Sequence, residues 1–474
     1  MDMPENQNSE AGADALEVMF ASSQGSARFE LGLQLADRLI SKSDYAAALS
    51  AIEEIQGLAP DEGRAALLSQ KLGRVNLRLS RYDQAYHHLG QALSKLGANP
   101  DCLELFMVYH DLAWMFYRQG QLSKARSYLE GAELVVDLRS DREPGIEAAR
   151  ADLLHVSALI EAASANHDMA LNLLEDERQI RRRLGDRARL AAVYNKISGV
   201  HQAKGDMVRA LRFQEQTLEM ARDCGDRFRE AVSYKNLGEI HHSLGETDKA
   251  GEFFRRSLEL SGEIGNRLGL AFARAGLGRL HTSRGEYALA EEHLLAALEV
   301  SRQVKSRERE SSVMADLAEL YCEWGKQDLA DKQLAAAEVL NNERDQFLSA
   351  RHQIVVAKVL SRGGKAQTAS SAACLSSSAQ ALSQARIILE GIVSQPVMID
   401  DEESLSCTEL EIEANLMLSQ VLARLGFRGR AQAAAAKAQA LTAAFSYNFS
   451  PEMKERYFAK PEVRRVFEWQ RELG

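Results

Sequence analysis

Residues 231–267 read AVSYKNLGEIHHSLGETDKAGEFFRRSLELSGEIGNR, and similar stretches occupy residues 191–227, 271–307 and 312–340. Their landmarks recur every 40 residues (238 − 198 and 278 − 238), as at Ser198, Gly238, Gly278 and Ala318 and at Ala210, Ala250, Ala290 and Ala330. A fixed period of this size is typical of an array of supersecondary units that bury their faces against one another. We therefore expect a repeat protein.

Each unit is predicted to contain two helices. In residues 231–267, Val232, Leu237 and Ile240 follow helical spacing, and a second helical set runs from Ala250 to Leu260. Glycine recurs between the two sets, at positions 205, 245, 285 and 325. Glycine suits the left-handed residue that ends a helix before a tight turn. The small residues that recur with Ser198 and with Ala210 every 40 residues allow the two helices to approach closely.

The connectors between units are also periodic, with the sequences Gly-Asp-Arg at 185–187 and 225–227, Gly-Asn-Arg at 265–267 and Lys-Ser-Arg at 305–307. The first residue suits a helix C-terminus, and Asp, Asn or Ser is a suitable N-cap for the next helix. The arginine ladder at 187, 227, 267 and 307 has two interpretations. It is either a solvated structural feature of the repeat or a functional row of charges.

The second copy resembles the tetratricopeptide repeat, through Tyr234, Leu237, Gly238, His241, Ala250 and Phe254. The resemblance is to the longer variant found in Pins/LGN-type adaptors, kinesin light chains and bacterial regulators. It covers most of the chain, although Ser257 replaces the usual alanine and histidine often replaces an aromatic residue. It implies an all-α fold, a right-handed α-solenoid or superhelix of about ten antiparallel helix hairpins.

The composition excludes several classes of protein. Hydrophobic residues make up 45% of the 474 residues and charged residues 27%, as expected of a folded water-soluble chain. The net charge of −10 and the absence of a basic stripe argue against a nucleic-acid partner. No stretch reaches the roughly 20 apolar residues of a membrane span. Five scattered cysteines and a polar, acidic N-terminus favour a cytoplasmic protein, and the alanine-rich composition favours a bacterial source.

Four regions are predicted along the chain. Residues 1–26 are expected to be disordered or to form a short N-terminal helix, and 27–344 to form seven to eight repeats. Residues 345–444 are expected to hold degenerate repeats with a flexible Ser/Ala/Gly-rich insertion at 363–380. An acidic loop is expected at 395–405. The aromatic residues 445–474 are expected to form capping helices, with Pro451 and Pro461 at helix starts. The alternative for this tail is a helix docked in the groove or offered to a partner.

No catalytic or metal motif is present. His201, His241 and His281 recur at the period, but adjacent hairpins are about 8–10 Å apart, too far for one zinc ion to be held by all three. They occupy an aromatic position of the family, so helix packing is the favoured interpretation. The sequence contains no Gly-rich phosphate loop, HExxH or GxSxG motif. We therefore expect a protein that is not an enzyme and needs no cofactor or metal.

The resemblance implies a concave groove lined by the first helix of each repeat. Its candidate partner-binding residues are Arg74, His110, Trp114, Tyr117, His155, Asn195, Lys235, Asn236, Glu239, His242 and Arg279. Trp and Tyr are enriched in binding hot spots, but Trp114 could equally pack against the neighbouring repeat. Lys235 matches the clamp that chaperone-binding members use for acidic chain ends, whereas Glu239 does not. Asn236 matches the asparagine that related grooves use to hold a peptide backbone.

Two functions from different classes follow. The first is a scaffold or adaptor that binds a peptide or helix of a partner protein in the concave groove. The second is a bacterial regulatory sensor whose superhelix binds a signal peptide or small ligand and changes conformation. Neither involves nucleic acid or insertion into a membrane, and self-association through the C-terminal region stays open. The identity of the partner cannot be read from the sequence.

Overall fold

The computed structural model describes residues 16, 18–41, 45–79, 81–97, 103–138, 145–340, 346–361, 378–394 and 407–473. The chain forms two compact units, residues 1–160 and 161–474. Residues 1–15 of the predicted disordered start lie outside the described residues. Residues 363–377 of the predicted insertion and all of the predicted acidic loop at 395–405 also lie outside them.

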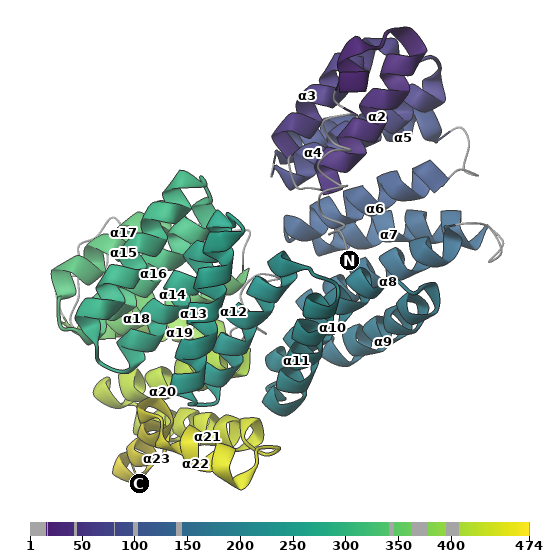
Figure 1. Cartoon of the computed structure of the whole chain (residues 1–474). Coiled ribbons are helices and arrows are strands. Elements are labelled where there is room, and N and C mark those ends of the chain that lie inside the picture. Colours follow the sequence, from purple (N-terminus) through teal and green to yellow (C-terminus); the bar gives the residue numbers. More distant parts are fainter. Residues whose placement is uncertain are drawn as a thin grey trace, which may run out of the picture. The chain divides into compact units, whose positions relative to one another are not determined.

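All the described secondary structure is helical (Figure 1). The helices that begin in the first unit are α2 (Gly25–Ser41), α3 (Tyr45–Ile55), η1 (Gln56–Leu58), α4 (Glu62–Arg78), α5 (Tyr82–Leu96), α6 (Leu103–Arg118), α7 (Leu122–Asp137) and α8 (Ile146–Ala163).

The remaining helices belong to the second unit. They are α9 (His167–Leu184), α10 (Arg187–Ala203), α11 (Met207–Asp223), α12 (Arg227–Ser243), α13 (Thr247–Glu263), α14 (Arg267–Ser283), α15 (Tyr287–Gln303), α16 (Arg307–Glu323), α17 (Gln327–Leu340), α18 (Gln346–Ser361), α19 (Ser378–Ser394), α20 (Cys407–Arg424), α21 (Arg428–Phe445), α22 (Pro451–Ala459) and α23 (Pro461–Leu473).

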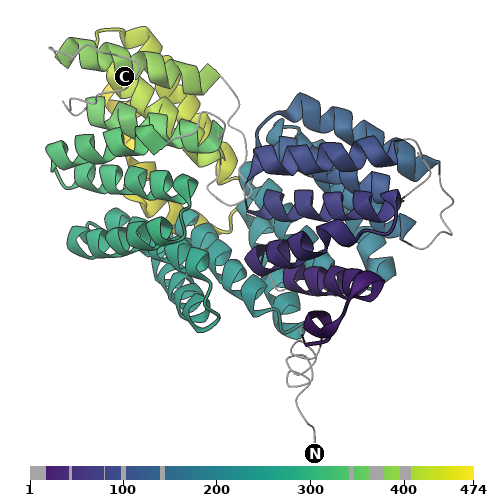
Figure 2. The same cartoon turned by 90° about the horizontal axis from the view of Figure 1, so that it is seen from above.

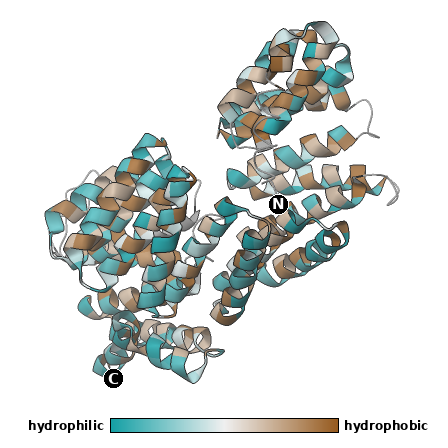
Figure 3. Ribbon diagram, in the orientation of Figure 1, coloured by the Kyte–Doolittle hydropathy of each residue, from teal (hydrophilic) through white to brown (hydrophobic). Residues whose placement is uncertain are grey.

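In chain order the described helices make ten successive pairs, α2–α3 to α20–α21, and then α22 and α23. Within either unit the two helices of a pair pack along their length, as α12 does on α13 and α14 on α15. The small residues of the period permit this contact, since a Cβ atom at Gly238 would lie 2.7 Å from Cδ1 of Phe254. Figure 3 shows apolar and polar residues alternating along the helices, as burial of one face requires. The predicted all-α solenoid of helix hairpins is confirmed.

The periodic connectors fold as predicted. Asp186, Asp226, Asn266 and Ser306 each cap a helix by accepting a hydrogen bond from the backbone N–H three residues later. The arginine ladder joins the two ends of a hairpin, because Arg187 pairs with Asp223 at 2.8 Å, Arg227 with Glu263, and Arg267 with Gln303. These side chains are exposed in both ion pairs, so each pair contributes little stability. The contacts bear out the structural interpretation of the ladder.

One connector keeps a strained residue. Lys305 has a φ of +57°, whereas glycine stands at the equivalent positions 185, 225 and 265 with φ between +65° and +69°. A side chain in this left-handed region costs about 1 kcal/mol relative to glycine. Lys305→Gly is therefore expected to raise the free energy of unfolding by about 0.5–1 kcal/mol in chemical denaturation. Lys305→Ala retains the strain and serves as the control, so an equal gain from both variants would contradict this explanation.

Candidate functional site

The eleven predicted partner-binding residues lie on the first helices of the hairpins, and their positions are here called the first-helix stripe. In the first unit they are Arg74 on α4, His110, Trp114 and Tyr117 on α6, and His155 on α8; all five are half-buried. In the second unit they are Asn195 on α10, Lys235, Asn236, Glu239 and His242 on α12, and Arg279 on α14. The two units are described separately below.

Asp111 organises the polar end of the stripe in the first unit. Arg74 donates to both of its carboxylate oxygens at 3.1 Å, and Gln70 donates to Oδ2. Nδ1 of His110 lies 3.5 Å from Oδ1. Burial alone would raise the pKa of Asp111, but the charge of Arg74 and the contacts of Arg74 and His110 outweigh it and lower the pKa to about 2. Arg74 is thus bound to a buried carboxylate of its own chain.

Trp114 and Tyr117 form the apolar end of this stripe. Their ring centroids lie 5.7 Å apart at an interplanar angle of 44°. Both rings pack against the core of α4–α8, and both stay half-buried rather than covered. Part of each ring is exposed on a face where the charged groups of Arg74 and Asp111 already pair with each other. This arrangement suits an apolar side chain of a ligand better than a charged one.

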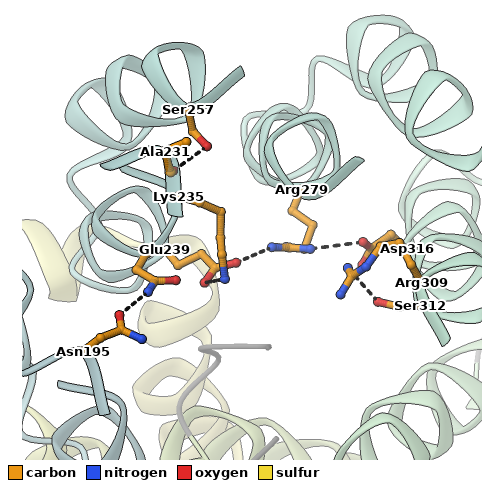
Figure 4. A network of polar contacts seen from close by, with 10 residues as sticks. Asn195, Ala231, Lys235, Glu239, Ser257, Arg279, Arg309, Ser312 and Asp316 are labelled. Carbon is orange, nitrogen blue, oxygen red and sulfur yellow. Dashed lines mark hydrogen bonds and ion pairs between the residues drawn. The ribbon is translucent and has the colours of Figure 1, made fainter. Parts of the chain in front are cut away.

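In the second unit two sets of polar contacts, which meet at the adjacent residues Lys235 and Asn236 of α12, form a network along the stripe (Figure 4). Asn236 donates to Oδ1 of Asn195 at 2.8 Å, which joins α12 to α10. Lys235 pairs with Glu239 at 3.3 Å, and Glu239 also accepts from Arg279 at 3.1 Å. Arg279 reaches in the other direction to Asp316 on α16 at 3.2 Å. The network therefore links four successive hairpins through their first helices.

Several members of this network were not predicted. Asp316 is 2% exposed, and Arg309 is 5% exposed with its guanidinium 3.8 Å from the ring centroid of Phe272. Further along, Lys358 on α18 pairs with both Glu319 on α16 and Glu413 on α20. Burial and the nearby charge of Glu319 raise the pKa of Glu413, although Lys358 opposes this. Charged residues spaced 40 apart on first helices were the available sequence signal, as with Glu239, Arg279 and Glu319.

His242 lies at the end of α12, within 3.3 Å of Oγ of Ser283. Burial lowers its pKa to about 3, with smaller contributions from the charges of Lys460 and Arg279. The periodic histidines on the other side of the hairpins stack on rings of the second helix, His201 on Phe213, His241 on Phe253 and His281 on His293. This confirms the helix-packing interpretation. Among the described residues no group of three or more His, Cys, Asp or Glu could hold a metal ion.

The family model of the tetratricopeptide repeat matches residues 63–132, 149–223 and 229–302. The chain contains tetratricopeptide repeats. The matched segments include every candidate residue on α4, α6, α8, α10, α12 and α14. A comparison with curated protein sequences gave no match.

Two solved structures of Rap proteins share the fold. A Rap protein in complex with Competence and Sporulation Factor is 17% identical, with a TM-score of 0.53 over 71% of this chain and 92% of that protein. The apo form of RapI is 13% identical, with a TM-score of 0.50 over 85% of this chain and 98% of RapI. At these identities the likeness is one of architecture. None of the described helices of this chain is long and apolar enough to cross a membrane.

Proposed function

We propose that this tetratricopeptide-repeat protein is a non-enzymatic scaffold that binds a peptide or helix of a partner protein on its first-helix stripe. The observation that carries the proposal is the half-buried pair of Trp114 and Tyr117 beside the Arg74–Asp111 ion pair. Aromatic side chains held by packing at the rim of a core are typical anchors of protein interfaces. The Arg74–Asp111 ion pair beside the two rings would set the register of a bound segment, and its two charges would remain paired with each other.

The proposal is tested by site-specific photo-crosslinking in native lysate. A photoreactive phenylalanine analogue replaces Tyr117 in one variant and Leu134 on α7, which is 66% exposed, in the control. A partner crosslinked from position 117 but not from 134 supports binding on the first-helix stripe. Crosslinking of the same partner from position 134 alone would place the interface on the second helices and contradict the proposal.

Trp114→Ala gives the quantitative prediction. We expect it to weaken binding of the crosslinked partner segment by more than about 1 kcal/mol, or roughly fivefold, because a hot-spot aromatic side chain is removed. Isothermal titration calorimetry measures the affinity, and circular dichroism at increasing temperature measures stability. The melting temperature is expected to stay near that of the unmodified chain. A large loss of stability would instead identify Trp114 as a core residue.

A second candidate function is a regulatory sensor that changes conformation when it binds a signal peptide or small ligand. The observation that favours it is Arg279, which contacts Glu239 and Asp316 on the two neighbouring first helices. A ligand carboxylate that took over Arg279 would release both links at once. The Rap structure, whose fold is similar, was solved with a bound Competence and Sporulation Factor. A ligand-dependent change in the radius of gyration would support this function, and an unchanged scattering curve at saturation would contradict it.

A further inference from the structure

The last helices of the chain pack back on repeats far earlier in the sequence. Within the second unit, α20–α23 lie beside the ends of α12 and α13 (Figures 1 and 2). Thr408 donates to the backbone oxygen of Ala203, and Lys460 to that of Ser243 at 3.2 Å. Repeats of a solenoid normally contact only their neighbours. This contact instead joins residues about two hundred positions apart, and we name it the clasp.

The clasp has a polar rim and an apolar centre. Ser243 donates to Glu409 at 2.6 Å, and Glu246 pairs with Arg456. The centre is one cluster of buried side chains from both sides. It comprises Met207, Ala210, Ile240 and Leu244 of the earlier repeats and Ile412, Leu416, Ala438, Phe445, Phe449, Tyr457, Val463 and Val466 of the later part. The earlier repeats therefore bury part of their apolar surface only against the end of the chain.

Those same repeats have a weak core of their own. Gln214 on α11 is fully buried, and neither its amide nitrogen nor its amide oxygen has a hydrogen-bond partner in the protein. The equivalent positions 174, 254 and 294 hold leucine, phenylalanine and leucine. The hydroxyl groups of Ser233 on α12 and Ser261 on α13 are also buried without a partner. Polar groups in this state are costly, because they lose water without gaining a bond.

The apolar core is correspondingly divided in this part of the chain. From α14 to α21 one large cluster of buried side chains continues through successive hairpins. Around α11–α13 the clusters are small, one around Leu237 and Tyr234 and another around Phe254 and Leu277. Regions with few buried apolar contacts open at lower free energy than the rest of a protein. The clasp thus covers the hairpins that need outside support most.

We propose that docking of α20–α23 keeps α10–α13 ordered, so that the C-terminal helices control the part of the first-helix stripe that carries Asn195, Lys235, Asn236 and Glu239. When the clasp is closed, the repeats that hold these side chains stay packed. When it opens, α10–α13 lose order before α14–α17. The consequence for partner binding rests on the proposed function, but the conformational coupling does not.

The clasp can be opened at one glycine that has a matched control. Gly245 has a φ of +78°, and a Cβ atom there would lie 2.9 Å from the backbone oxygen of Arg456. Gly285, one repeat later, has a φ of +74° and nothing within 4 Å of its Cβ position. Gly245→Ala and Gly285→Ala therefore share the backbone strain of a left-handed alanine. Only the first also pushes against the clasp.

The experiment is hydrogen–deuterium exchange by mass spectrometry on the full chain without ligand. In Gly245→Ala we expect amides of α10–α13 to exchange about tenfold or more faster than in Gly285→Ala, while α14–α17 change little. Gln214→Leu, placed in the Gly245→Ala background, is expected to restore much of the protection because it fills the position as Leu294 does. Equal exchange in the two glycine variants would overturn the proposal. So would faster exchange confined to α22 and α23.

A second variant guards against general misfolding. Arg456 is 47% exposed at the side chain and pairs with Glu246, so Arg456→Glu introduces repulsion at the rim without disturbing a core. Arg464→Glu on α23 is its control, since Arg464 donates only to the backbone oxygen of Ala459 among the contacts described. We expect Arg456→Glu to speed exchange in α10–α13 and Arg464→Glu to leave it unchanged. These exchange measurements need no partner, so they test the clasp even if the first-helix stripe binds nothing.

Discussion

Arg74→Met is expected to lower the free energy of unfolding of the first unit by about 3 kcal/mol. Asp111 is 6% exposed at its side chain, and Arg74 supplies its charged partner on the neighbouring hairpin. Without Arg74, a buried carboxylate would keep only Gln70 and the weaker contact of His110. Loss of one member of a buried ion pair is costly because the remaining charge has already been taken out of water. Urea denaturation followed by tryptophan fluorescence measures the change.

Two variants show whether the buried charge is the cause. Arg64→Met removes a pair with Glu30 in which both side chains are more than 40% exposed, and we expect a loss below about 1 kcal/mol. Adding Asp111→Asn to Arg74→Met removes the uncompensated charge and is expected to recover part of the stability. Similar losses from Arg64→Met and Arg74→Met would show that the burial of Asp111 carries no special cost. The result also matters for binding studies, because an Arg74 variant that unfolds would lose partner binding even if Arg74 did not contact the partner.

Acidification from pH 7 to pH 5 is expected to destabilise α10–α13 before the other hairpins of the second unit. Burial lowers the pKa of His201 to about 4 and that of His242 to about 3, and it also lowers the pKa of His241. In the unfolded chain these histidines titrate near 6.5. Between about pH 6.5 and pH 4 the unfolded chain therefore binds protons that the folded chain does not. Stability is present above 6.5 and is lost as the pH falls through this window.

The expected size is about 2 kcal/mol at pH 5 for each histidine that stays neutral. Charges facing His201 are those of Asp206, Arg209 and Lys204, and those facing His242 are Lys460, Arg279, Glu319 and Arg284. Burial raises the pKa of Glu215 on α11, which acts in the opposite direction within this window and offsets part of the loss. Hydrogen exchange at pH 7 and pH 5, corrected for intrinsic rates, locates the loss.

His201→Phe is the matched variant for this prediction. It keeps a ring that can stack on Phe213 and places there the aromatic residue that the family usually has. It also removes one titrating group. We expect the pH dependence of stability between pH 7 and pH 5 to become shallower. An unchanged slope would show that His201 contributes none of it. Uniform loosening of α10–α17 would show that the acid acts through general charge rather than through these histidines.

The local architecture was predictable from the sequence because the 40-residue period records contacts between neighbouring helices. The small residue at 238, the N-cap at Asp226 and the ring position at His241 each specify a contact within one or two helices. The clasp could not be predicted in this way. Its partners, such as Ser243 and Glu409, are 166 residues apart and obey no period. The sequence draws attention to the aromatic tail, but nothing in the sequence indicates where its rings pack.

The candidate site was predicted by position more than by role. The family phase placed Lys235 and Glu239 on one first helix and Arg279 on the next, and the structure joins the three side chains by ion pairs. A single sequence cannot show that Arg74 is committed to Asp111, since the burial of a carboxylate depends on the helices around it. Gln214 is a different case. Alignment of the repeats with one another places an amide where leucine or phenylalanine is usual, so the sequence alone carries a signal of this weakness.

The clasp has an evolutionary consequence. An open solenoid can gain or lose a repeat by duplication or deletion of one coding unit, because each new hairpin only has to match its neighbours. Here the hairpins between α12 and α20 must place Glu409 against Ser243. The number of these hairpins therefore determines whether the two residues can reach each other. Removal of one 40-residue unit from this span would leave every remaining interface intact and still separate the two ends. The clasp therefore constrains the copy number of these repeats, a constraint that an open solenoid lacks.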